Sequence, residues 1–112
     1  MFGRIKKVYA TDIVAVAYSG SEIPSFEKAD AYMIYAVDED KVRRTQILSI
    51  YSRDIDEVIE ELKFIDCNAI ICKNYGPKAL AKLKKAELEV YDFNGGAKAA
   101  VLAFARQQLK KI

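Results

Sequence analysis

The chain has 112 residues, of which 52% are apolar and 30% are charged, so it fits one globular domain and leaves no room for two. Its 18 basic and 16 acidic side chains nearly balance, which argues against the marked basic excess of a dedicated nucleic-acid or membrane binder. The sequence contains no histidine, and this removes the usual base at neutral pH and the commonest metal ligand.

The cysteine content indicates a reducing compartment. Cys67 and Cys72 are too few for a disulfide framework, and they lie on either side of one short predicted strand, a poor arrangement for bridging each other. No apolar run is long enough to span a membrane, and residues 1–12 lack the continuous apolar core of a signal peptide. We therefore expect a cytoplasmic protein that binds neither a membrane nor nucleic acid.

Three strands are predicted in the first half of the chain. Residues 12–20, DIVAVAYSG, form an apolar, β-branched run closed by Ser-Gly, which predicts a strand at 12–18 that is buried on both faces. Residues 31–37, AYMIYAV, predict a second strand, and an acidic turn separates it from the more polar residues 41–51, which suit the edge of a sheet. We expect these strands to form an antiparallel meander. Residues 1–11, an N-terminal extension, fit either an extra strand or a short packing helix.

The apolar period changes after Tyr51. Apolar residues recur at helical spacing between Ile55 and Ile65, and Asp54 followed three residues later by Glu57 resembles a capping box. The next apolar run, NAIIC at 68–72, is short and β-branched, which predicts a strand.

Two further helices and one strand complete the predicted order. Pro77 stands at the first position of a helix, where its missing N–H costs nothing. Residues 87–93, ELEVYDF, predict a strand, and the apolar residues between Ala97 and Ala105 predict a last helix. The two β-α-β crossovers should place the strands at 12–18, 68–72 and 88–93 parallel to one another.

Two stretches of the sequence resemble a known family. They are NAIICKNYGPKALAKLKKAELEVYDFNGG and SFEKADAYMIYAVDEDKV, and both resemble the dinitrogenase iron–molybdenum cofactor biosynthesis family, the NifX-like domains. The resemblance covers residues 12 to 110. It implies a ribonuclease H-like α/β fold: a single three-layer domain over residues 12–112, with a five-stranded mixed sheet and the element order βββαβαβα.

The resemblance also implies a function. Characterised relatives bind the iron–molybdenum cofactor or its iron–sulfur precursor and pass it on, so we expect a non-catalytic carrier with a protein partner in cluster delivery. One departure concerns Ser25, Phe26 and Glu27, because the family often has His-Phe-Gly there, and a candidate cluster ligand is thus replaced. Another anionic ligand, such as a phosphorylated metabolite, or a protein partner is the alternative.

A ligand crevice is expected beyond the carboxyl ends of strands 12–18 and 68–72, where the connections leave in opposite directions. The loop 21–27 could close over this crevice. The helix beginning near Pro77 would present free N–H groups and a partial positive charge, which favour an anion. The candidate ligand-binding residues are Ser19, Gly20, Phe26, Lys73, Asn74, Tyr75, Gly76, Asn94 and Gly95.

Cys72 is the candidate metal ligand, because thiolates bind iron–sulfur clusters well. The alternative is that Cys72 ends a buried strand as a small hydrophobe. A single cysteine cannot hold a cluster alone, so Glu22, Glu27, a partner or a second copy would have to contribute. The implied fold also hosts two-metal nucleases, but the carboxylates that those enzymes need are not clustered in the sequence. We therefore expect no catalytic residues.

Overall fold

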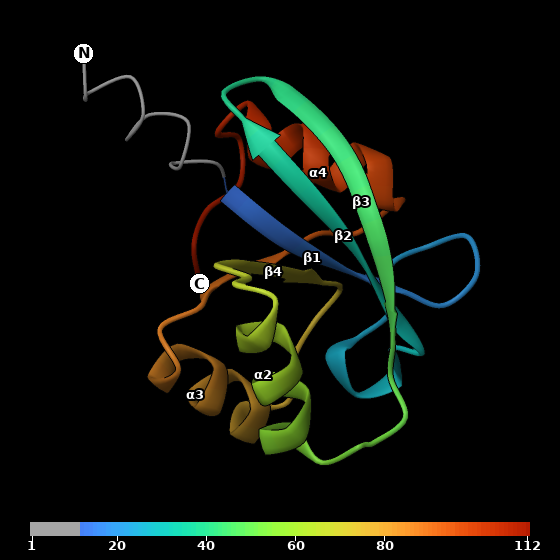
Figure 1. The fold of residues 1–112 in the computed structure, drawn as a ribbon, viewed down its shortest axis with the longest axis vertical. Coiled ribbons are helices and arrows are strands. Elements are labelled where there is room, and N and C mark those ends of the chain that lie inside the picture. The colour runs from blue at the N-terminus through green and yellow to red at the C-terminus, as the bar shows by residue number, and fades with distance from the viewer. Residues whose placement is uncertain (1–11) are drawn as a thin grey trace.

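The fold is organised around a five-stranded mixed sheet, shown in Figure 1. The structure is a computed structural model, and it describes residues 12–112. The strands are β1 (Asp12–Tyr18), β2 (Ala31–Asp38), β3 (Lys41–Ser49), β4 (Ala69–Cys72) and β5 (Glu89–Asp92), and their order in the sheet is β3-β2-β1-β4-β5. Strands β1, β2 and β3 pair antiparallel, whereas β4 and β5 run parallel to β1. The predicted meander and the predicted parallel strands are confirmed.

Three helices cover the two faces of the sheet. They are α2 (Ile55–Phe64), α3 (Pro77–Lys85) and α4 (Ala97–Ala105). Helices α2 and α3 pack against each other, and α4 contacts β1, β2 and β3 on the opposite face (Figure 1). The single α/β domain with three layers is thereby confirmed. No helix among residues 12–112 is long and apolar enough to cross a membrane. The expectation for residues 1–11 lies outside the described part of the chain.

The centre of the sheet is buried from solvent, as the apolar runs predict. Residues 14–17 of β1 and all four residues of β4 have no exposed surface. Among the strands of residues 12–112, β3 pairs only with β2 and is mostly exposed, so it forms an edge of the described sheet. Strand β1 ends at Tyr18, as predicted, because Ser19 and Gly20 begin a turn in which Gly20 has a φ of 87°. The third strand ends at Ser49 rather than at residue 51.

The predicted helix starts are confirmed with one difference. Pro77 opens α3 after Gly76, and Asp54 caps α2 by accepting hydrogen bonds from the backbone N–H groups of Asp56 and Glu57. The reciprocal bond of a capping box is absent among these residues, because the Asp54 N–H donates to Ser52 Oγ at 3.0 Å instead. The short 3₁₀ helix η1 (Phe26–Lys28), which lies between β1 and β2, was not predicted.

Candidate functional site

The segment between β1 and β2 crosses the carboxyl ends of the parallel strands. Backbone N–H groups of Ile23, Phe26 and Lys73 donate to the carbonyl oxygens of Gly95, Asn74 and Pro24 respectively, at 2.9 to 3.0 Å. These bonds join the segment to the loops that follow β4 and β5. The 21–27 loop therefore lies over the ends of these strands, as expected, and it brings Phe26 to Asn74 and Ile23 to Gly95.

The first turn of α3 is occupied by a side chain of the same molecule. Glu27 on η1 accepts a hydrogen bond from the Gly76 N–H, with 2.9 Å between Oε2 and the nitrogen. A Cβ at residue 76 would lie only 2.8 Å from the same oxygen, so the glycine permits this close approach. The Gly76 amide, which was expected to be free for a ligand anion, therefore has a carboxylate partner within the chain.

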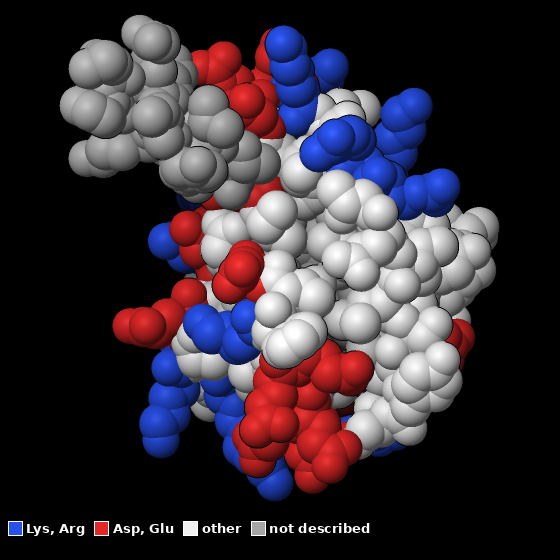
Figure 2. All heavy atoms as spheres, in the orientation of Figure 1, with Lys and Arg blue, Asp and Glu red and all other residues white. Residues whose placement is uncertain are grey.

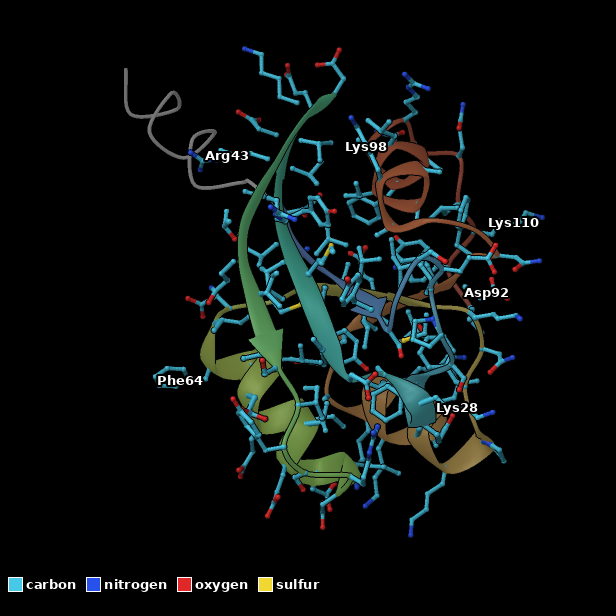
Figure 3. The ribbon with its side chains drawn as sticks, turned by 90° about the vertical axis from the view of Figure 1, so that its right-hand side faces the viewer. Lys28, Arg43, Phe64, Asp92, Lys98 and Lys110 are labelled. Atoms are coloured by element: carbon cyan, nitrogen blue, oxygen red, sulfur yellow. The ribbon has the colours of Figure 1, made fainter. Side chains whose placement is uncertain are left out.

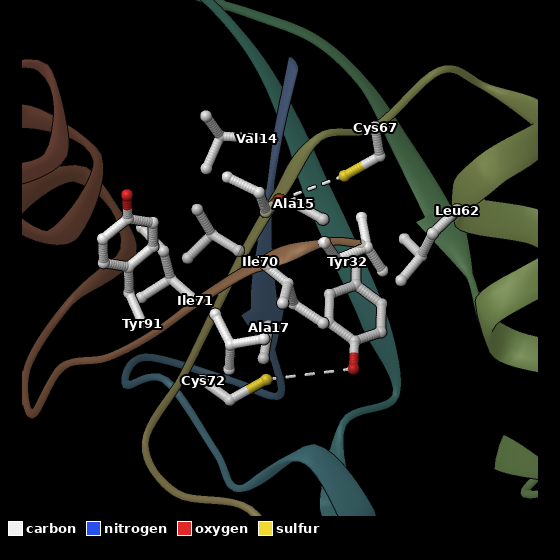
Figure 4. Packing of buried hydrophobic residues seen from close by; sticks show 14 of the residues in the cluster. Val14, Ala15, Ala17, Tyr32, Leu62, Cys67, Ile70, Ile71, Cys72 and Tyr91 are labelled. Carbon is white, nitrogen blue, oxygen red and sulfur yellow. Dashed lines mark hydrogen bonds between the residues drawn. The ribbon is translucent and has the colours of Figure 1, made fainter. Parts of the chain in front are cut away.

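Cys72 lies beneath this segment and is fully buried. Its Sγ is 3.9 Å from the hydroxyl oxygen of Tyr32, at a distance where either group can donate (Figure 4). The ring of Phe26 lies beside Tyr32 and Tyr75, with centroid distances of 6.5 and 6.3 Å. Burial raises the pKa of the Cys72 thiol to about 12, so the neutral thiol is strongly favoured in this conformation. The thiol is therefore shielded from solvent like a small apolar side chain of the core.

Tyr75 turns its hydroxyl inward rather than toward the crevice. The hydroxyl donates to the Tyr91 carbonyl at 2.6 Å and lies 3.3 Å from the Ile70 carbonyl. Burial raises the pKa of this phenol well above its ordinary value. The ring remains at the site, because it stacks against Phe26. Tyr75 thus supports the segment that covers Cys72.

A hollow of about 550 Å³ remains on the surface beside these bonds. Its size is within the range of small-ligand sites. Two lysines and one acid, Lys28, Lys73 and Glu22, give it an excess of positive charge; Figure 3 shows Lys28 on η1. Its polar uncharged lining includes Ser19, Ser21, Ser25 and Asn74. The predicted residues Ser19, Lys73 and Asn74 therefore meet at one hollow.

This hollow is not lined by three of the predicted residues, Gly20, Asn94 and Gly95. Gly20 supplies the turn after β1, and Gly95 accepts the hydrogen bond from Ile23. Asn94 is exposed in the loop after β5. Lys28 was missed in the sequence, because its position depends on η1, and a single helical turn carries no apolar periodicity.

A second hollow, of about 650 Å³, lies between η1 and the start of α2. Its apolar lining comes from Phe26, Tyr32, Ile50, Ile55 and Val58. Arg53, which the sequence analysis did not single out, lies at this hollow and holds η1 in place. Its guanidinium donates to the carbonyl oxygens of Glu27 and Ala29 at 3.1 and 2.7 Å, and it also pairs with Asp30 at 3.4 Å.

The lysines of α3 do not form part of either hollow's positive charge. Lys82 pairs with Asp56 of α2, with 3.0 Å between Nζ and a carboxylate oxygen. Figure 2 shows acidic side chains gathered over α2, and they balance this basic helix. Lys78 and Lys85 are exposed to solvent.

The described residues offer no complete metal-binding set. Among residues 12–112, no group of three or more His, Cys, Asp or Glu side chains is arranged to hold a metal ion. Cys67 and Cys72 are both free thiols, as predicted. Cys67 donates to the Ala69 carbonyl at 3.0 Å and is buried at the other end of β4. Any bound cluster would depend on charge, on one thiol, or on ligands from another molecule.

Comparison with known proteins gives a family match over most of the chain. Residues 12–107 match the family described as dinitrogenase iron-molybdenum cofactor. No curated protein matches the sequence significantly.

Several solved structures share the fold. A Methanocaldococcus jannaschii protein, provisionally described as a dinitrogenase, is 26% identical with a TM-score of 0.75, over 91% of this chain and 95% of that one. A Thermotoga protein provisionally described as a NifB protein is 22% identical with a TM-score of 0.68, over 89% and 92%. The apo form of the orange protein from Desulfovibrio gigas is 18% identical with a TM-score of 0.70, over 90% and 92%. The last two likenesses show the fold alone.

Proposed function

Because the chain belongs to the dinitrogenase iron–molybdenum cofactor family, we propose that it binds a metal–sulfur cluster and passes it on without catalysing a reaction. The cargo is the iron–molybdenum cofactor or an iron–sulfur precursor of it. A protein that delivers or receives the cluster is the second partner in this proposal. The family name supports an association with the cofactor, and the geometry at the carboxyl ends of the parallel strands supports the position of the site.

The observation that carries the proposal is the hollow lined by Lys28 and Lys73. It lies where the carboxyl ends of β1 and β4 meet, the usual ligand position in open α/β sheets. A metal–sulfur cluster whose organic arm bears carboxylates is an anion, and the two ammonium groups attract it. The hydroxyls of Ser21 and Ser25 offer hydrogen bonds to the same ligand, whereas the Ser19 hydroxyl donates to Asp30 at 2.6 Å.

Cys72 remains the proposed metal ligand of this site. Its Sγ is buried beneath Phe26, so a metal–sulfur bond would require η1 to move. Coordination would favour the thiolate and release the thiol proton to solvent. Because one thiolate leaves the cluster with open positions, a second copy or the delivering partner would supply the remaining ligands.

A second candidate function is the binding of another small anion. Ser25 and Glu27 keep it open, because their replacement of the His and Gly that often stand there in the family removes a candidate cluster ligand and leaves the hollow in place. The positive hollow would serve a phosphorylated metabolite equally well, since phosphate is recognised by the same cations and hydroxyls.

Anaerobic loading with ferrous iron and sulfide tests the proposal. We expect the protein to retain iron and sulfide after desalting, and the double variant Lys28→Ala/Lys73→Ala to retain them about tenfold more weakly, because the attracting charge is lost. The control is Lys78→Ala/Lys85→Ala, which removes the same charge from the exposed face of α3. Equal retention by both double variants would remove the hollow from the proposal. Stabilisation by inorganic phosphate alone, without retained iron, would support the second candidate.

A further inference from the structure

Two aromatic side chains separate the larger hollow from the Cys72 thiol. Phe26 and Tyr32 both line the hollow of about 650 Å³. Behind them, the Tyr32 hydroxyl lies 3.9 Å from Cys72 Sγ, as Figure 4 shows. Phe26 is 7% exposed and Tyr32 is 1% exposed, whereas Cys72 has no exposed surface. The rings of Phe26 and Tyr32 therefore stand between this hollow and the thiol.

The two aromatic residues are anchored very differently. Tyr32 belongs to β2 and is paired on both sides, with Ala17 of β1 and Leu48 of β3. Phe26 belongs to a single turn of 3₁₀ helix outside the sheet. A side chain on a short turn can leave its position at far lower cost than one in the centre of a sheet. Phe26 is thus the side chain whose movement would open the route.

The side-chain contacts that hold η1 in place lie mainly at the surface, and one backbone bond, from the Phe26 N–H to the Asn74 carbonyl at 3.0 Å, adds to them. Arg53 donates to the carbonyl oxygens of Glu27 and Ala29, and Glu27 reaches the Gly76 N–H on the other side. Both charged side chains are exposed to solvent. Exposed polar contacts contribute little stability and open readily. The buried ring of Phe26 is the main apolar contact of the turn itself.

We infer that η1 is a gate, and that its outward movement removes Phe26 and joins the larger hollow to the Cys72 thiol. With the gate open, Cys72 Sγ and the Tyr32 hydroxyl form the inner wall, and Arg53 and Asp30 stay at the mouth, because Glu27 and Lys28 move with η1. A thiophilic metal centre fits the thiol at the inner end, and the paired charges of Arg53 and Asp30 leave the mouth close to neutral. The nature of this ligand rests on the proposed function, whereas the gate does not.

Alkylation of the ligand-free protein with iodoacetamide tests the gate. The sulfur forms a bond to carbon, iodide leaves, and the thiol proton passes to solvent. The rate at each cysteine is measured by mass spectrometry, and Cys67 reports global unfolding, because it is a free buried thiol at the other end of β4. We expect Phe26→Ala to raise labelling of Cys72 by about tenfold or more and to leave that of Cys67 unchanged, since only the local route opens.

Two further variants keep the test decisive. Phe104→Ala removes an aromatic ring that packs against Tyr91, with a centroid distance of 5.3 Å and no part in η1, so we expect no selective effect on Cys72. Arg53→Ala loosens η1 without removing a core side chain, and we expect it to raise Cys72 labelling selectively, by a smaller factor. The gate would be overturned if neither Phe26→Ala nor Arg53→Ala raised the labelling rate of Cys72 above that of Cys67. That outcome includes equal increases at both cysteines and no increase at either. Failure of iron and sulfide retention in the wild type would instead overturn the proposed function and leave the gate standing.

Discussion

The carboxylate of Glu27 links η1 to the first turn of α3, two elements whose bonded residues are 49 positions apart in the chain. A negative charge at the start of a helix is favourable, because the free N–H groups carry partial positive charge. The contact therefore stabilises α3 and holds the covering segment over Cys72. It also means that an incoming anion meets a carboxylate at this turn, so the positive hollow around Lys28 and Lys73 is the better anion position.

Two replacements of Glu27 should lower the free energy of unfolding to different extents. We expect Glu27→Ala to lower the free energy of unfolding by about 1 kcal/mol, as the loss of a helix-capping side chain does. Glu27→Gln keeps an oxygen that can accept from the Gly76 N–H, so its loss should be smaller. Urea unfolding of the three proteins measures the difference. Equal stability of all three would show that the bond contributes nothing in solution.

The elements differ in how well sequence alone could predict them. Helix α2 and strand β4 were predictable, because a run of apolar residues at helical spacing and a short β-branched run have few other solutions. Pro77 marked the start of α3 for a stated steric reason. The turn η1 was not predictable, because three residues reading Phe-Glu-Lys carry no period, and its position depends on contacts with α3 and Arg53.

The residues of the candidate site differ in the same way in how well sequence alone could predict them. Ser19, Lys73 and Asn74 follow directly from the ends of β1 and β4, so the predicted strand order already placed them together. Lys28 and Arg53 reach the site only through η1, and nothing in their local sequence marks them. The inward turn of the Tyr75 hydroxyl also depends on a distant group, the carbonyl of Tyr91.

At the scale of the whole molecule, the core contains thiols and phenols but no charged side chain. Among residues 12–112, every buried side chain is apolar, a cysteine or a tyrosine. Burial raises the pKa of the Cys67 thiol to about 11 and that of the Cys72 thiol to about 12, and it raises the pKa of the Tyr32 and Tyr75 phenols as well. The folded state therefore holds these protons more tightly than the unfolded chain does.

This proton retention predicts a loss of stability at alkaline pH. In the unfolded chain the thiols and phenols ionise near their ordinary pKa values of 9.0 and 10.0. Below pH 9 both states keep the protons and stability is unaffected, whereas above it the unfolded chain releases protons that the folded chain keeps. Each such group should then lower the free energy of unfolding by up to about 1.4 kcal/mol per pH unit.

Urea unfolding at pH 7, 9, 10 and 11 measures this effect. We expect stability to fall progressively above pH 9, and the variant Tyr75→Phe to show a shallower slope, because one buried phenol is removed. A free energy of unfolding that stays constant to pH 11 would contradict the burial of these groups.

The central claim is that a metal–sulfur cluster binds at the carboxyl ends of the parallel strands. Nuclear magnetic resonance of the ¹⁵N-labelled protein, titrated without oxygen with an iron–sulfur cluster preformed on a small thiol, tests it most directly. A paramagnetic cluster broadens the signals of nearby amides, so we predict losses at Ser19, Lys28, Lys73 and Asn74. The amide signals of Asn68 and Glu89, at the amino ends of β4 and β5, should stay sharp. Broadening confined to those amino ends, or absent throughout, would contradict the account.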